Sequence, residues 1–337
     1  MTLVKSHVDK YSSVDEVVLR EHYDVAFLGA SWDNRCLLIS KMSGVDIGAV
    51  WVGKFENPGV SGRSSLHLGL IRKFADGLGL EAEELQLDSG ELVQSWLMVR
   101  SRVVALYRSL GRPVRILVDL SALPRFVTLG ILAFGLRSNV VQSVTYVYGI
   151  AGGYVHDFPQ VTGQDAYGFS EGSWRPLPVP GLSRGGTGHA PGHLIVSVGY
   201  DGAKLKKLVG VLEPDSLNIV LAGRPGEKLH DRAARENEQL ALSFGQGRCE
   251  TMSVSLEGVS EVRGLVRSWA ERAAGGGSEV SIVLAGPKLH SLGFALAALD
   301  AKVANFFYIV PDSHRELFVD PIQAVIVAHC EVGFGAS

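Results

Sequence analysis

The sequence predicts an α/β protein made by tandem duplication of one unit, with mainly parallel sheets covered by helices on both faces. Short apolar runs alternate with longer stretches whose apolar residues follow helical spacing. The runs are almost continuously apolar, which is typical of parallel strands buried on both faces. One strand-to-helix turn also occurs twice, as PRFVTLGILAFGL from Pro124 and PKLHSLGFALAAL from Pro287, 163 positions apart.

Length and composition limit the classes of protein to consider. The chain has 337 residues, 46% of them hydrophobic and 20% charged, enough for two domains with cores of their own. The 32 Lys and Arg against 35 Asp and Glu leave a net charge of −3, so no overall positive charge indicates a nucleic-acid partner.

Cysteine usage and hydropathy indicate the compartment. The three cysteines, Cys36, Cys249 and Cys330, are odd in number and far apart, so we expect no disulfide framework and a cytoplasmic protein. The first residues lack the pattern of a signal peptide, and no apolar run reaches the roughly 18–20 residues that span a bilayer. We therefore expect no membrane partner.

The first half is expected to form one domain over residues 23–170, after a polar lead-in at 1–22. Its expected strands are 24–31, 47–55, 84–88, 114–121 and 143–149. Its expected helices are 33–42, 65–78, 91–110 and the segment that begins at Pro124.

The same order of elements returns after a Pro- and Gly-rich segment at 171–192, which we interpret as a linker. The second domain is expected over 193–337, with strands at 193–202, 217–226, 279–287 and 304–312 and helices at 203–212 and 259–273. Two sets of residues match at one offset of 170: Gly29 with Gly199, and the pair Gly53-Lys54 with Gly223-Arg224. This repetition is the basis for predicting a duplication.

Each half therefore has the pattern of a Rossmann-like unit. In open α/β sheets, ligands bind beyond the carboxyl ends of the strands, where the repeated turns lie. Two such units side by side are expected to bring Arg125 and Lys288 to one shared cleft.

The first candidate ligand site is GASWDNR, residues 29–35. Gly29 and Ser31 end a strand at the start of a helix, where backbone N–H groups bind phosphate or another anion, and Arg35 adds positive charge. The alternative is that Asp33 only caps the helix and Arg35 is solvated. The segment is neither GxGxxG nor a Walker P-loop.

The second candidate is DLSALPR, residues 119–125. Asp119 ends a buried strand, where a carboxylate is costly unless it is paired or functional. With Ser121 and Arg125 it forms a polar cluster suited to a ribose, a base edge or a phosphate. A structural tie between Asp119 and Arg125 is the alternative.

The second half supplies the remaining candidates, for which solvated loops and helix starts are the alternative. Gly286 allows close backbone approach, and Lys288 and His290 are of types that meet phosphates. The turn after the strand at 193 contributes Gly199, with Tyr200 and Asp201 beside it. Both halves contribute loop cations expected at the rim, namely Lys54 and Arg63 from the first half and Arg224 and Lys228 from the second.

Catalytic signatures are scarce. The chain has no GxSxG, no HExxH and no CxxC, so we assign no catalytic residue and expect neither a metal nor a cofactor.

The turns GASWDNR and GPKLHS, within tandem Rossmann-like units, resemble those of the CARF superfamily, and the tandem arrangement resembles SAVED domains. The resemblance covers the order of elements over most of the chain, while DLSALPR departs from the usual pattern. It implies a sensor of cyclic oligonucleotides in bacterial antiviral defence, with a separate effector protein as partner.

Three functions stay open on the sequence. The first is a protein that binds a nucleotide or cyclic oligonucleotide. The second is an enzyme acting on a nucleotide or nucleoside, with Asp119 as base or ribose ligand and Arg125 or Lys288 stabilising charge. The third is a structural subunit whose apolar segment at 324–334 adds a strand to a sheet or meets a partner. A homo-oligomer is compatible with all three.

Overall fold

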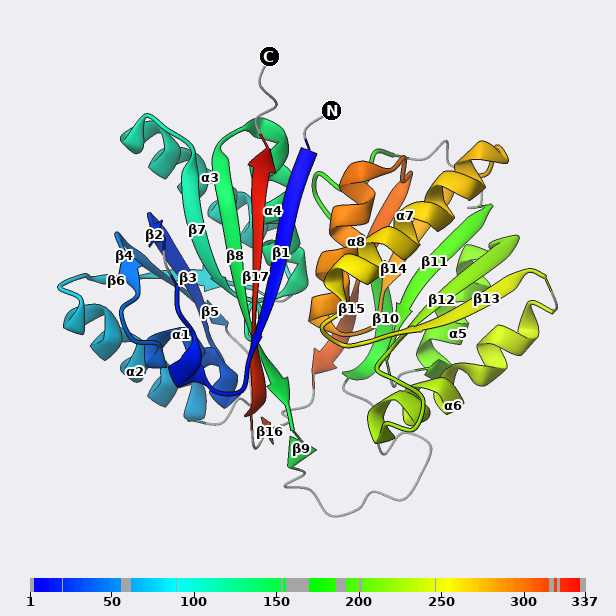
Figure 1. Cartoon of the computed structure of the whole chain (residues 1–337), viewed down its shortest axis with the longest axis horizontal. Helices are drawn as coiled ribbons and strands as arrows, with labels where there is room; N and C mark the ends of the chain where they lie inside the picture. The colour runs from blue at the N-terminus through cyan, green and yellow to red at the C-terminus, as the bar shows by residue number, and fades with distance from the viewer. Residues whose placement is uncertain are drawn as a thin grey trace. The chain divides into compact units, whose positions relative to one another are not determined.

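The computed structural model describes residues 3–19, 21–55, 62–88, 90–152, 154–155, 170–185, 192–199, 202–245, 247–314, 318–319 and 322–333. The chain divides into two compact units (Figure 1). Unit 1 comprises residues 1–157 and 316–337, and unit 2 comprises residues 158–315.

Unit 1 is built on a seven-stranded sheet with the order β1-β17-β8-β7-β3-β5-β6. Strands β3, β5, β6, β7 and β8 run parallel, and β17 pairs antiparallel with both β8 and β1. The strands are β1 (Leu3–Tyr11), β3 (Val25–Ala30), β5 (Val50–Phe55), β6 (Ala82–Leu87), β7 (Val114–Asp119), β8 (Val141–Ala151) and β17 (Ile322–Gly333). The short strands β2 (His22–Tyr23) and β4 (Asp46–Ile47) form one pair, and β9 (Tyr154–Val155) and β16 (Phe318–Val319) form another.

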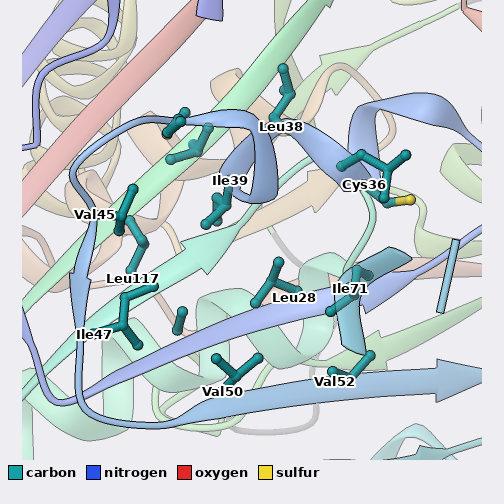
Figure 2. Close-up of a cluster of buried hydrophobic side chains, with 14 of the residues drawn as sticks. Leu28, Cys36, Leu38, Ile39, Val45, Ile47, Val50, Val52, Ile71 and Leu117 are labelled. Atoms are coloured by element: carbon teal, nitrogen blue, oxygen red, sulfur yellow. The ribbon is translucent and has the colours of Figure 1, made fainter. Parts of the chain in front are cut away.

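Helices cover both faces of this sheet (Figure 1). The helical elements are η1 (Val14–Glu16), η2 (Asn34–Leu37), α1 (Leu38–Lys41), α2 (Arg63–Gly77), α3 (Leu92–Leu110) and α4 (Arg125–Ser138). Because successive side chains of a strand point to opposite faces, Leu28 of β3 packs with α1 and α2, as Figure 2 shows, while Phe27 meets Trp51 on the other face.

Unit 2 has a six-stranded sheet with the order β10-β15-β14-β11-β12-β13. Its strands are β10 (Ser170–Pro178), β11 (His193–Val198), β12 (Ser216–Ala222), β13 (Cys249–Val254), β14 (Val280–Leu284) and β15 (Asn305–His314). Its helices are α5 (Gly202–Leu212), α6 (Lys228–Ser243), α7 (Val259–Gly275) and α8 (Lys288–Asp300). Only β10 is antiparallel to its neighbour.

The predicted α/β class with mainly parallel sheets is confirmed. Both units also share one strand order. In unit 1 the chain runs from β3 to β5 and β6 on one side and then to β7 and β8 on the other; in unit 2 it runs from β11 to β12 and β13 and then to β14 and β15. A duplication predicts such a repeat of topology, and the duplication itself remains a prediction.

The domain boundaries differ from the expected ones in three places. The expected lead-in contains β1, whose polar and apolar residues suit an edge strand, and the expected linker contains β10. Prolines are tolerated in β10 because it lies at the edge of its sheet. The segment at 324–334, assigned to the second domain, instead adds β17 to unit 1, between β1 and β8.

No helix in the described ranges is both long enough and apolar enough to cross a bilayer.

Strand β17 is predicted to be essential to unit 1. Ile326 of β17 is fully buried, so Ile326→Ala should lower the free energy of unfolding of unit 1 by about 2–4 kcal/mol. Gln323→Ala, at an exposed position three residues away in the same strand, is the control and should change the free energy of unfolding by less than about 0.5 kcal/mol. Urea unfolding followed by hydrogen exchange in β7 and in β14 reports the two units separately. If Ile326→Ala destabilised unit 2 and left unit 1 unchanged, the assignment of β17 to unit 1 would be wrong.

Candidate functional site

The strand order of unit 1 reverses between β3 and β7. The two strands pair only as far as Phe27 and Val118, after which their exit loops leave toward opposite sides of the sheet. Ligands of open α/β sheets bind in the crevice at such a switch point, beyond the carboxyl ends of the strands. The first two candidate segments, 29–35 and 119–125, are the exits of these two strands.

Glycine at position 29, near the end of β3, lets this strand pack closely against the exit loop of β7. A Cβ atom placed on Gly29 would lie 2.8 Å from Cβ of Ala122 and 3.2 Å from the backbone nitrogen of Leu123. Real Cβ atoms do not approach other carbon atoms this closely, so a larger residue at 29 would push the loops apart. The glycine therefore serves packing between the loops at the switch point.

Asp119 and Ser121 fix the exit of β7. The buried Asp119 accepts the backbone N–H groups of Ser121 at 2.8 Å and Ala122 at 3.2 Å through Oδ1, which forms an Asx turn. The hydroxyl oxygen of Ser121 accepts the backbone N–H of Gly149, in β8, at 3.0 Å. Both side chains thus bind the backbone, and they join the loop to the neighbouring strand.

Asp33 and Arg35 fix the exit of β3. Asp33 caps η2, as predicted, by accepting the backbone N–H of Arg35 at 2.9 Å. The guanidinium of Arg35 returns to the same carboxylate, with Nη2 2.6 Å from Oδ2. It also donates to the carbonyl oxygen of Gly149 at 3.3 Å and lies 5.7 Å from the centre of the Tyr148 ring. Arg35 is therefore a paired, largely buried cation.

Two cationic side chains mark the edge of the crevice. Arg125 is the first residue of α4, and Pro124 before it offers the helix no side-chain cap. Lys54 is exposed near the end of β5. Because the N-terminus of a helix carries partial positive charge, the start of α4 and these cations create a positive potential at this edge.

Two further buried side chains adjoin the exit of β3, and the sequence analysis assigned neither a role at this site. Nδ1 of His67, on α2, lies 2.7 Å from the carbonyl oxygen of Ser31 and 3.3 Å from Sγ of Cys36. Burial raises the pKa of the Cys36 thiol to about 12, so this thiol stays neutral and is a poor nucleophile.

The switch point of unit 2 lies between β11 and β14 and is also made of closely packed glycines. A Cβ atom on Gly199 would lie 2.9 Å from the carbonyl oxygen of Ala285, and one on Gly286 would lie 3.0 Å from that of Val198. Lys288 is the first residue of α8, as Arg125 is of α4. Tyr200 and Asp201 lie outside the described residues.

The remaining candidates of unit 2 lie apart from this switch point or within the core. Arg224 is exposed in the loop after β12. His290 is fully buried in α8, and its Nε2 lies 2.9 Å from the carbonyl oxygen of Ser255, to which it donates. Burial lowers the pKa of His290 to about 4, so the ring is neutral and packed in the interior.

The structure thus brings seven candidates together in unit 1, namely Gly29, Ser31, Asp33, Arg35, Asp119, Ser121 and Arg125. In unit 2 it places Gly199, Gly286 and Lys288 at one switch point. A cleft shared by Arg125 and Lys288 remains a prediction. Within the described part of the chain, no three His, Cys, Asp or Glu side chains converge as metal ligands.

Comparisons with known proteins show similarity to solved structures only. No protein-family model and no curated protein matches the sequence. The structure is similar to that of a type III CRISPR defence DNA nuclease activated by cyclic oligoadenylate, with a TM-score of 0.49 and 10% identity over 84% of this chain and 64% of that one. The chain therefore spans less than two thirds of that nuclease. A second similar structure is assigned as a universal stress protein from Pseudomonas aeruginosa UCBPP-PA14, with a TM-score of 0.24 and 10% identity over 86% of this chain and 94% of that one.

The contact between the two exit loops yields a prediction. Gly29→Ala should destabilise unit 1 by about 1–3 kcal/mol, because its Cβ overlaps Ala122. Adding Ala122→Gly should restore part of the loss. Gly69→Ala, where a Cβ meets no other atom, is the control and should cause no loss. Urea denaturation of the three variants and of the double variant measures the coupling, and strictly additive effects of Gly29→Ala and Ala122→Gly would refute the contact.

The burial of His290 predicts a loss of stability at acid pH. Above about pH 6.5 neither state holds the extra proton. As the pH falls toward 4, the unfolded chain takes up a proton that buried His290, with a pKa of about 4, does not, so the free energy of unfolding of unit 2 decreases. Between about pH 7 and about pH 5 the loss should be about 2 kcal/mol greater than in His290→Gln, which stays uncharged. Urea-dependent hydrogen exchange in α8 measures it; identical pH profiles would show that the ring is protonated in the folded state.

Proposed function

We propose that unit 1 binds a phosphate-bearing nucleotide of the cyclic-oligonucleotide class at the switch point between β3 and β7, and that the protein is a sensor. The observation that carries the proposal is the convergence at this point of the end of β3, which bears Gly29, the fixed exit loop of β7, and the start of α4 with Arg125. Backbone donors, a helix dipole and a guanidinium together suit a phosphate.

The start of α4 is the proposed phosphate subsite. The helix is 14 residues long, and the N–H groups of its first turn are directed along the axis toward the crevice end. Arg125 at its first position adds a full positive charge to the partial charge of the helix. Arg35 contributes less, because the carboxylate of Asp33 already neutralises it.

The exit of β3 is the proposed subsite for the sugar or base. The carboxylate of Asp33 accepts three hydrogen bonds from Arg35, two from its guanidinium and one from its backbone. This pair is held in place by Gly149 and lies beside Ser31 at the exit of β3. Hydroxyl groups of a ribose and amino groups of a base are donors for carboxylate oxygens.

Binding is favoured over catalysis by the state of the reactive groups. Asp119 is buried with Oδ1 engaged in its own turn, and burial keeps the Cys36 thiol neutral and therefore a poor nucleophile. A sensor needs a partner to respond, and the resemblance to CARF and SAVED proteins implies a separate effector chain in antiviral defence.

Calorimetry with the whole chain tests the proposal, using AMP, ATP, linear oligoadenylate and cyclic oligoadenylate as probes. Arg125→Ala should weaken binding by about 1.5–3 kcal/mol, the range for a hydrogen bond to a charged group. This is roughly a tenfold to hundredfold rise in Kd. Arg137→Ala, in the last turn of the same helix, is the matched control and should leave Kd unchanged.

The same mixtures separate the alternatives. Chromatography after incubation should return every probe intact; formation of a product would favour the enzyme. Failure of all four probes to bind the unaltered protein would overturn the proposal, and equal effects of Arg125→Ala and Arg137→Ala would remove α4 from the site.

A further inference from the structure

We propose that His67 and Asn237 are equivalent positioning residues, each of which holds the turn that leaves the first parallel strand of its unit. They lie 170 positions apart, the offset that also relates Gly29 to Gly199 and Gly53 to Gly223. Each is on the helix that follows the second parallel strand, α2 in unit 1 and α6 in unit 2. The proposal deepens the proposed function, because the turn held by His67 contains Asp33 and Arg35.

In unit 1, the bond runs from His67 to the first residue after β3. Nδ1 of the ring lies 2.7 Å from the carbonyl oxygen of Ser31. A carbonyl oxygen only accepts hydrogen bonds, so Nδ1 carries the proton and donates it. The imidazole is 4% exposed on a helix face otherwise made of Leu68, Ile71 and Ala75. A buried polar ring is costly without a partner, and the turn provides that partner.

In unit 2, the bond runs from Asn237 to the first residue after β11. The amide Nδ2 lies 2.9 Å from the carbonyl oxygen of Gly199 and 2.8 Å from that of Ala233. Both partners are acceptors, so the orientation of the amide is determined without ambiguity. Asn237 is 3% exposed, which makes it another buried polar residue on the inner face of its helix.

The two bonds therefore join the same pair of elements in both units with different chemistry. An imidazole N–H in one case and an amide N–H in the other reach the backbone carbonyl that directly follows the first strand. In unit 1 this carbonyl begins the turn whose Asp33 and Arg35 bind one another and Gly149. His67 thus acts on the ligand site through the turn, while helix α2 supplies the rigid support.

Hydrogen exchange tests the pairing without any ligand. His67→Leu and Asn237→Leu remove the donor at similar size, and His67→Asn and Asn237→His exchange the two native residues and keep it. Exchange should be about tenfold faster in the peptide containing residues 31–37 for His67→Leu, and in the peptide containing Gly199 for Asn237→Leu. In His67→Asn and Asn237→His, which keep the donor, hydrogen exchange of these peptides should be near the native rate. Strands β7 and β14 should be unchanged in all variants and serve as internal references.

Two outcomes of the hydrogen-exchange experiment would overturn the proposal. If hydrogen exchange in the peptide containing residues 31–37 is as fast in His67→Asn as in His67→Leu, the N–H donor does not hold the turn. His67→Ala serves as a second donor-free variant if His67→Leu does not fold. Slowed or unchanged exchange in His67→Ala would equally refute the inference.

A ligand arm separates this inference from the proposed function. With cyclic oligoadenylate as probe, His67→Leu should raise Kd about tenfold and His67→Asn should restore it. If the unaltered protein does not bind the probe but the exchange pattern holds, the proposed function fails and the pairing of His67 with Asn237 stands. If the probe binds but hydrogen exchange in the donor-free variants stays at the native rate, the proposed function stands and the pairing of His67 with Asn237 fails.

Discussion

Strand β8 continues past the end of its neighbour β7, and the backbone of Gly149 lies in the part that β7 does not reach. The last pair of the two strands joins Asp119 to Val147. A buried backbone group without a partner costs about as much as a lost hydrogen bond, so the N–H and carbonyl of Gly149 require other partners. Ser121 binds the first and Arg35 the second.

This requirement determines the shape of the candidate site. The two partners come from the exit loops of β7 and β3, so satisfying one glycine brings both loops over the switch point. Gly149 itself must lack a side chain, because a Cβ atom there would lie 2.8 Å from Cδ1 of Leu38 and 3.1 Å from Cγ of Arg35. Asp33 then compensates the charge that Arg35 carries into this largely buried position. Most polar side chains of the site thus bind protein, and Arg125 adds a positive charge at the start of α4.

The sequence allowed prediction of the elements whose signal is local. Continuous apolar runs identified β3, β5, β7, β8 and β11, and the cap at Asp33 was correct because an Asx cap depends on residues within one turn. The sequence did not reveal helix α6, since its residues are mostly polar. Nor did it reveal the roles of β1 and β10, which depend on partners about 130 or more positions away.

For the site, the segments were predictable and the roles were not. Arg35 and Asp33 were recognised as polar residues at a strand end, but their mutual pairing and the bond to Gly149 follow from β8, 114 positions away from Arg35. His290 shows the same limit, because its position after a proline suggested a ligand contact while helical geometry directs it into the core. His67 lacked any local motif, and only its offset of 170 from Asn237 singled it out.

The place of β17 also orders events during synthesis. This strand lies between β1 and β8 in the sheet, although it follows both of them and the whole of unit 2 in the sequence. A ribosome therefore releases every residue of unit 2 before unit 1 receives its inner strand. Until then β1 lacks the strand with which it pairs in the described sheet, and one edge of β8 is open to other strands. Unit 1 is therefore completed only after all of unit 2 has been synthesised, and until then its open strand edges are exposed to misassembly.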